Sequence, residues 1–195
     1  MIQTAAQAIL DFWFLPAGDP GHHHYRAEWF RKDDAFDAAI RTQFAADTTA
    51  ALAGNRLDNE DAPSRLAEIL LLDQFTRNIF RDTPRAFAGD AQALALANVL
   101  MNKGLDLTLP PFMRWFAYLP FEHSESLADQ EQAVALFTRL GADAQDEAFG
   151  AALDYAIRHR DVITKFGRFP HRNAILGRDS TAEELAFLSQ PGSSF

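Results

Sequence analysis

The strongest structural signal in this chain lies in residues 63–80, PSRLAEILLLDQFTRNIF. Placed on a helix at about 100° per residue, the apolar side chains of this stretch form two stripes on opposite sides. The first stripe contains Leu66, Ile69, Leu70 and Phe80, and the second contains Leu71, Leu72, Phe75 and Ile79. A helix that is apolar on two sides is usually surrounded by other elements. The stretch therefore predicts a central helix around which the rest of the chain packs.

Two charged residues, Asp73 and Arg77, fall inside the first apolar stripe at i, i+4 spacing. Charges on an apolar face are costly unless they are paired, so we expect both side chains to be mostly buried and in contact. Two interpretations remain open at this point. In the first, mutual neutralisation lets the pair sit within the core and nothing more; in the second, the pair forms the charged floor of a pocket.

Helix start and stop signals recur along the whole length. Caps such as Thr4 and Asp33, and glycines that follow a helix such as Gly54 and Gly167, mark the ends, and no stretch alternates long enough to predict a strand. Pro120, Gly141 and two capping boxes, Ser126 with Asp129 and Ser180 with Glu183, are expected to bound later helices. We expect helices at about 4–14, 33–53, 63–80, 90–103, 112–119, 126–140, 146–166 and from 180, with a short one near Asn173.

The organisation that follows is a single all-α domain over residues 1–195, with no linker of interdomain character. Helices joined by short turns pack as antiparallel hairpins, so a hairpin array is the expected architecture.

Composition narrows the classes of partner. The net charge of −9 argues against a nucleic-acid partner, and no apolar run approaches the ~20 residues that would span a membrane. The chain has no cysteine, which excludes disulfides and thiolate chemistry. The N-terminal segment lacks the features of a signal peptide, so the expected location is cytoplasmic. No sequence motif predicts a bound cofactor, so we expect none.

Two places in the sequence carry histidines that have plain structural explanations. His159 is the one strongly polar group on the apolar face of the 146–166 helix, where a satisfied core histidine is the commoner case. His22, His23 and His24 form a run whose side chains cannot all face one site, which predicts a surface loop.

Residues 120–130, PFEHSESLADQ, collect acids and a histidine around a helix start. The helix dipole alone explains Glu125 and Asp129. The alternative is that His123 and a carboxylate such as Glu122 form an acid–base pair, or half of a metal site. A metal site needs three or four convergent ligands, and no metal-binding spacing is present, so we predict none.

Residues 166–178, FGRFPHRNAILGR, form a basic turn in an acidic protein. Arg168, His171 and Arg172 crowd the end of one helix and the expected start of another. Guanidinium groups in such a turn make a good anion site. They could equally clamp helix carbonyls and acidic neighbours, and the sequence does not separate the two.

Five stretches together resemble the family called domain of unknown function (DUF) 924, over nearly the whole length. They are AILDFWF (8–14), WFRKDDAFDAAI (29–40), ILLLDQFTRNIFRDTPRAFAGDAQALALA (69–97), YLPFEHSESLADQEQAVALF (118–137) and ITKFGRFPHRNAILGRDSTAEELAFL (163–188). Thr76 stands where the family pattern has proline. The resemblance implies an all-helical, tetratricopeptide-repeat-like fold and carries no established activity.

Two functions from different classes therefore compete, besides a purely structural role. In the first, a small anionic ligand binds in an inter-helix pocket, held by Asp73, Arg77, Arg168 and Arg172, with His123, Glu122 and His171 as candidate catalytic residues. In the second, the helical array is a module that binds a protein or peptide partner. The sequence leaves open whether the chain is an enzyme. The first hypothesis requires that segments 120–130 and 167–173 meet the central helix.

Overall fold

The structure, a computed structural model, describes residues 4–57, 59–144 and 146–193. These residues are helices and connecting turns, and no strand occurs among them, so the predicted all-α class is confirmed. The α-helices are α1 (Ala5–Phe14), α2 (Asp34–Leu52), α3 (Ala62–Ile69), α4 (Thr76–Ile79), α5 (Asp90–Asn102), α6 (Pro111–Glu122), α7 (Leu127–Asp143), α8 (Glu147–Phe166) and α9 (Ala182–Leu188). Shorter helical turns are η1 (Ala27–Trp29), η3 (Pro84–Phe87), η4 (Asp106–Thr108) and η5 (Pro170–Arg172), and a π-helical segment, η2 (Leu70–Phe75), joins α3 to α4.

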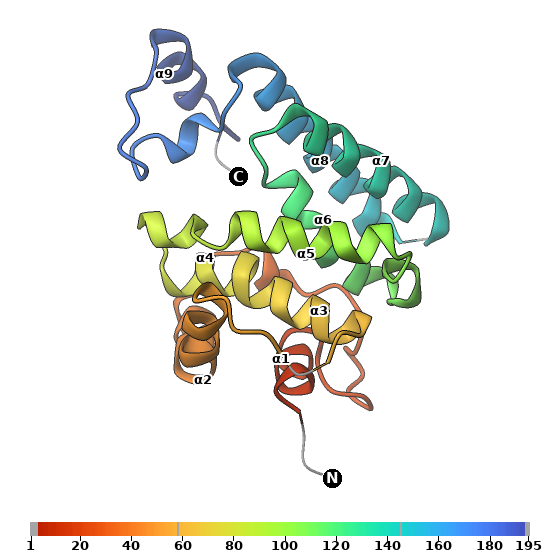
Figure 1. Cartoon of the computed structure of the whole chain (residues 1–195). Helices are drawn as coiled ribbons and strands as arrows, with labels where there is room; N and C mark the ends of the chain where they lie inside the picture. The colour runs from red at the N-terminus through yellow and green to blue at the C-terminus, as the bar shows by residue number, and fades with distance from the viewer. Residues whose placement is uncertain (1–3, 58, 145, 194–195) are drawn as a thin grey trace.

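The helices stack roughly in chain order (Figure 1), from α1 and α2 at one end, through α5 and α6, to α7 and α8 at the other. In the upper part α7 packs against both α6 and α8, which gives the expected hairpins of sequential helices. The short α9 lies at the upper left in Figure 1. This arrangement is compatible with a tetratricopeptide-repeat-like array, which stays a prediction.

The predicted central helix is observed, with one departure from simple α-helical geometry. Nearly every residue of α3 and η2 is buried, because α1, α2, α5 and α6 pack around them. Within η2 the backbone bonds skip one residue further than in an α-helix, which inserts an extra residue into the turn. This π segment contains Asp73 and changes the direction in which its side chain leaves the helix.

Gly89 allows α5 to approach this segment closely. A Cβ atom at Gly89 would collide with the backbone carbonyl of Leu72, while the φ angle of Gly89 is one that any residue can adopt. Glycine is therefore needed here for space and not for backbone freedom. The close approach places Asp90, the first residue of α5, beside the end of the central helix.

Several predicted helix ends were correct. Thr4 and Asp33 cap α1 and α2 through their side chains, and Gly167 ends α8 in the left-handed conformation with φ of 68°. These are local signals, which act through the hydrogen-bonding groups of adjacent residues.

Other predicted ends were wrong. Pro120 lies inside α6, which continues to Glu122, and α7 passes through Gly141 to Asp143. Both helices are held by packing against each other, and this outweighs a breaker near a terminus. The final capping box is Thr181 with Glu184, one residue later than the predicted Ser180 with Glu183.

Two further expectations need correction. Ser126 precedes α7 but makes no side-chain cap bond, because Asp129 instead accepts a hydrogen bond from Ser124. The segment near Asn173 forms the short turn η5 and not a regular helix.

Candidate functional site

A pocket of about 860 Å³ opens where α6, α8, the end of the central helix and the irregular segments after α1 and α8 meet. This volume lies within the usual range for small-molecule sites. The charged and polar side chains that line one part of it come from four separate stretches of sequence. They include Arg77, Glu122, His123, His159, His171 and Arg172.

The innermost contact joins Asp73 of η2 to His123, which directly follows α6. Nδ1 of His123 lies 2.7 Å from Oδ1 of Asp73, whose side chain is completely buried. The other carboxylate oxygen accepts a hydrogen bond of 2.6 Å from the Gln74 amide, and Arg77 lies 3.2 Å from Oδ1. Asp73 is thus surrounded by donors from its own helix and from α6.

These contacts decide the charge states. Burial opposes ionisation of Asp73, but Arg77 and His123 outweigh it and hold the pKa of this carboxyl below its ordinary value. Burial and the charge of Arg77 lower the pKa of His123, in spite of the opposing effect of Asp73. Neutral His123 therefore carries its proton on Nδ1, donates it to Asp73, and keeps Nε2 as a proton acceptor.

Two arginines share one carboxylate behind this pair. Arg77 donates to both oxygens of Asp90, at 2.9 and 3.2 Å, and Arg172 donates to one of the same oxygens at 3.2 Å. Burial works against the charge of Arg77, but Asp73 and Asp90 raise its pKa. Arg77 is therefore the cation that the carboxylates neutralise most fully.

Arg172 is less completely satisfied. Its guanidinium lies over the rings of Phe87 and Phe169, at 4.7 and 4.5 Å from their centroids, and only 6% of the residue is exposed. Its Nε atom is buried and has no hydrogen-bond acceptor among the described residues. Burial and the neighbouring Arg77 lower the pKa of Arg172 to about 10, so it remains a cation at neutral pH under electrostatic penalty.

Glu122 and His159 form a second pair on the same wall. Oε1 of Glu122 lies 3.3 Å from Nδ1 of His159, which also lies 2.8 Å from the carbonyl of Tyr155. Burial and the charge of Asp73 raise the pKa of Glu122 to about 8. Burial lowers the pKa of His159 to about 3, so the carboxyl is largely protonated and the imidazole neutral at pH 7.

The environment thus separates proton donors from proton acceptors within one pocket. Glu122 offers a proton near neutral pH, and His123 offers an unprotonated nitrogen held in place by Asp73. Groups whose pKa values are pushed apart in this way are typical of acid–base sites. Burial also lowers the pKa of the adjacent His171, to about 4, which adds a third neutral imidazole to those of His123 and His159.

Gln130 of α7 fixes the end of α6 that carries Glu122 and His123. Its amide nitrogen lies 2.6 Å from the carbonyls of Glu122 and Ser124, groups that a helix end leaves without partners. The two titratable side chains are therefore held by a residue that is itself fully buried.

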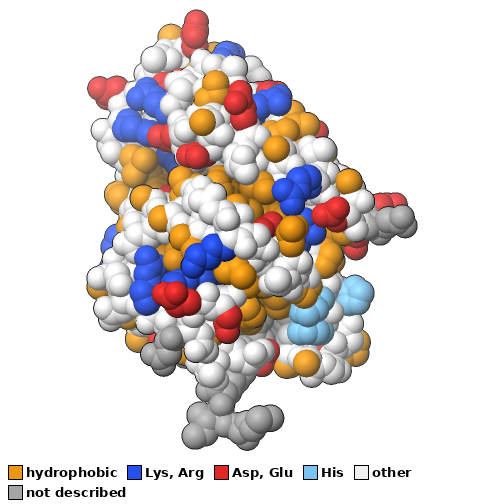
Figure 2. Space-filling view, turned by 45° about the vertical axis from the view of Figure 1, so that its right-hand side comes forward, with side chains coloured by type: hydrophobic (Ala, Val, Ile, Leu, Met, Phe, Trp, Pro, Cys, Tyr) orange, Lys and Arg blue, Asp and Glu red, His pale blue; other side chains and the backbone are white. Residues whose placement is uncertain are grey.

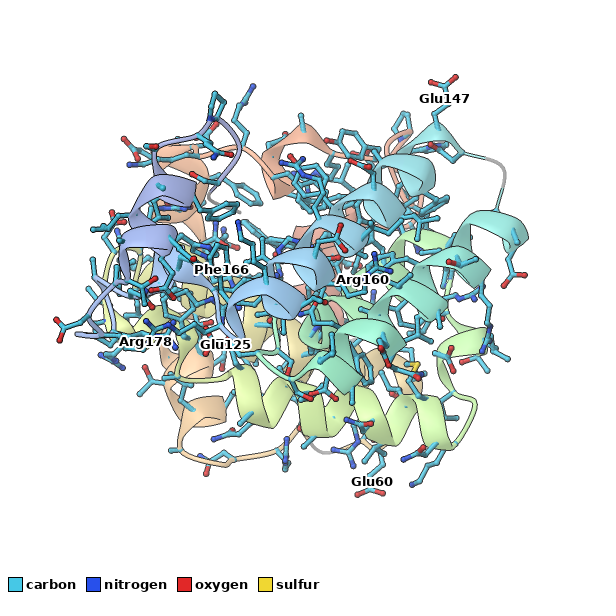
Figure 3. All side chains as sticks on the ribbon, turned by 90° about the horizontal axis from the view of Figure 1, so that it is seen from above. Glu60, Glu125, Glu147, Arg160, Phe166 and Arg178 are labelled. Carbon is cyan, nitrogen blue, oxygen red and sulfur yellow. The ribbon has the colours of Figure 1, made fainter. Side chains whose placement is uncertain are left out.

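The segment after α8 is fastened by its own ion pairs. Arg178 donates to both oxygens of Glu125, at 2.7 and 2.9 Å, and Figure 3 shows these two side chains beside each other. Arg168 forms a second two-bond pair with Glu184 of α9, at 2.7 and 2.8 Å. These contacts hold Arg172 and His171 against the pocket.

The prediction that segment 120–130 meets the central helix is confirmed by the contact of His123 with Asp73. Segment 167–173 reaches the end of that helix through Asp90, which Arg77 and Arg172 share. Asp73 and Arg77 are in contact as expected, with Asp73 fully and Arg77 largely buried. Of the predicted site residues, the structure brings Arg77, Glu122, His123, His171 and Arg172 to the pocket wall. Two do not reach it. Asp73 lies behind the wall as a support, and Arg168 lies outside it because Glu184 holds its guanidinium.

Sequence reasoning missed two parts of the site. Asp90 is predicted only as the start of a helix. In the structure its carboxylate accepts hydrogen bonds from both Arg77 and Arg172, and so joins the two arginines. The aromatic part of the wall was missed as well, because Tyr25, Trp29 and Phe30 lie in an irregular segment without periodicity. His159 was predicted to be a core residue, and it is both buried and part of the wall.

The described surface outside the pocket offers fewer indications of a binding site. Lys and Arg are mixed with Asp and Glu on the face in Figure 2, where histidines gather at the lower right edge. Of the predicted surface run, His24 is exposed, while His22 and His23 are half-buried. Within the described ranges no three His, Asp or Glu side chains are grouped to hold a metal ion. None of the helices that the structure describes could span a bilayer.

Comparison with known proteins identifies the family. The chain resembles the structure of a protein of unknown function, ATU0120, from Agrobacterium tumefaciens, with 40% sequence identity and a TM-score of 0.79 over 94% of this chain and 96% of that one. No curated protein matches the sequence. Residues 9–192 match the model of a family described as a bacterial protein of unknown function, DUF924. The chain therefore belongs to the DUF924 family.

Proposed function

We propose that this protein binds a small organic anion in the pocket, with Arg172 and Arg77 as the anion-binding groups. The observation that carries the proposal is that Arg172 lines the pocket and its buried Nε–H has no acceptor among the described residues. An unsatisfied buried donor on a charged group is costly, and an oxyanion that accepts from it would remove that cost. The single carboxylate of Asp90, shared by both arginines, leaves further donors for the ligand.

The acid–base groups define what the site could do with such a ligand. Glu122 would donate a proton or a hydrogen bond, and Nε2 of His123 would accept a proton, with Asp73 as the residue that orients His123. A proton-transfer reaction on a bound anion is the reaction class that these groups support. The cytoplasmic location, and the alternative of a peptide or protein partner, stay predictions.

The test is a titration of carboxylates and phosphate esters against the purified protein, followed by calorimetry and melting temperature. A ligand that binds the native state at 100 times its Kd adds about 2.7 kcal/mol of stability. We expect Arg172→Gln to weaken binding at least tenfold. Arg160→Gln is the matched control, because Arg160 is on α8, outside the pocket lining, and should bind within twofold of the wild type.

A second readout concerns Glu122. Above pH 8 its ionisation places a negative charge beside the bound anion, so the affinity of the wild type should fall there. Glu122→Gln should abolish that fall. The proposal fails if no anion in the panel stabilises the protein, or if Arg172→Gln binds as tightly as the wild type.

A further inference from the structure

The pocket is elongated along one face of α8. Ala148, Ala151, Ala152, Tyr155 and His159 all contribute to its wall. Between the first and the last of these residues the helix advances about 16 Å, at about 1.5 Å per residue. The three alanines leave space where larger side chains would fill the groove.

Its two ends differ in chemistry, because α6 and α8 run in the same direction. Near the start of both helices, Trp115 lies 5.8 Å from Phe149, and Phe30 in turn lies 5.1 Å from Trp115. Near their far ends, Glu122 lies 3.3 Å from His159, whose ring is 6.4 Å from that of His123. The end near Trp115 and Phe30 is therefore rich in aromatic rings, although Arg31 and Glu147 also belong to the lining, and the far end holds the paired histidines and Glu122.

The aromatic end is open to a ligand. Tyr25 and Phe30 are each 49% exposed although they line the pocket, and so is Tyr155 midway along α8. Large apolar side chains exposed together along a groove mark a binding surface for apolar material. The buried Nε of Arg172 at the charged end is independent of this observation.

We infer that the ligand is an elongated amphiphile, a carboxylate whose unbranched apolar tail lies along α8 toward Tyr25 and Phe30. This inference rests on the anion-binding function proposed above and specifies its ligand class. The carboxylate sits at Arg172 and Arg77, and the tail covers the alanines. An extended hydrocarbon chain advances about 1.3 Å per carbon, so a chain that fills about 16 Å contains about 12 carbons.

The test uses straight-chain saturated carboxylates from 4 to 16 carbons, titrated by calorimetry below their micellar concentrations. Each added methylene buries apolar surface, so Kd should fall about three- to fourfold per carbon up to about 12 carbons. Beyond that length the affinity should level off, because further carbons would extend into water. The methyl esters of the same acids should bind at least tenfold more weakly.

A variant that shortens the groove makes the test specific. Ala151→Phe places a ring in the path of the tail at an exposed helical position, so it should leave folding intact and move the levelling-off to chains several carbons shorter. The affinity for the shortest acids should not change. Ala135→Phe, at an exposed position on α7 outside the pocket lining, is the matched control and should keep the wild-type profile.

The outcomes separate this inference from the function on which it rests. If short acids and phosphate esters bind through Arg172 with no dependence on chain length, the amphiphile is ruled out and the anion site stands. If long chains bind equally well to the Arg172→Gln variant, or their esters bind as well as the acids, the orientation along α8 is overturned. If no carboxylate or phosphate ester binds, both proposals fail.

Discussion

Nδ1 of His123 lies 2.7 Å from Oδ1 of Asp73, although the two residues are 50 positions apart in the sequence. One belongs to the π segment of the central helix and the other follows α6. This contact ties the buried charge of the helical core to the wall of the pocket. Its neighbours, Arg77 and Asp90, extend the same network to Arg172.

Arg77→Ala should destabilise the protein strongly. The change removes the cation that contacts both Asp73 and Asp90, and leaves the fully buried Asp73 with His123 and Gln74 alone. Breaking a buried pair in this way typically costs about 3–5 kcal/mol. Chemical denaturation measures the loss. Arg160→Ala, which removes a surface pair with Asp161, should cost less than about 1 kcal/mol, and equal effects of the two changes would contradict the network.

Glu122→Gln should change how stability depends on pH. The pKa of this carboxyl rises from 4.5 to about 8 on folding, so the folded state holds a proton that the unfolded chain releases. The stability contributed by Glu122 is therefore complete below pH 4.5 and is lost as the pH rises through 8. Glutamine cannot ionise, so the melting temperature of the variant relative to the wild type should increase by roughly 8–15 °C between pH 5 and pH 8.5.

Glu131→Gln provides the comparison for this pH series. Glu131 is exposed on α7 and lies outside the pocket lining, so its variant should remain within about 0.5 kcal/mol of the wild type. His159 acts in the opposite direction, because its pKa falls from 6.5 to about 3 on folding and stability is lost as the pH decreases. A Glu122→Gln curve parallel to the wild-type curve would show that the folded state does not retain this proton.

Gly89→Ala should destabilise the protein by about 1–3 kcal/mol, the usual cost of an overfilled contact. The added methyl group would collide with the Leu72 carbonyl and push the start of α5 away from the π segment. In Gly141→Ala, at an exposed position of α7, the new Cβ meets nothing within 4 Å. That variant should gain about 0.5–1 kcal/mol from helix propensity. Thermal unfolding of both variants tests this explanation. A loss of stability in Gly89→Ala alone shows that the close approach to Leu72, and not the loss of a glycine in general, causes the effect.

Gln130→Ala should weaken the end of α6. The amide of Gln130 bonds to the carbonyls of Glu122 and Ser124, and its loss leaves these buried acceptors unsatisfied at a cost of about 1–3 kcal/mol. Gln132→Ala, exposed on the same helix, should remain within about 0.5 kcal/mol of the wild type. Hydrogen exchange should be faster at residues 121–124 in the first variant only. Unchanged hydrogen exchange at these residues would show that Gln130 does not hold the end of α6 in place.

Helix content was predictable because the signals that specify it are local. Caps at Thr4 and Asp33 and the left-handed Gly167 act within one turn, and the two-sided stripe of residues 63–80 identified the central helix from its periodicity. The helix ends predicted at Pro120 and Gly141 were wrong because the signals of these two residues are also only local. Their local preference to end a helix was overcome by packing among α6, α7 and α8, which local signals do not contain.

The sequence by itself determined which residues need a partner. Asp73, Arg77 and Arg172 are charges in apolar surroundings, and such groups must be neutralised wherever the chain places them. Only the tertiary structure decided which partner each one meets. Asp90 joins Arg77 to Arg172, while Glu184 draws Arg168 away from the pocket. These pairings depend on the π segment, which contains Asp73, and on the close approach at Gly89, which brings Asp90 beside the central helix. Charge and hydropathy along a chain specify the need for a contact, but only the packed backbone sets the distances at which contacts form.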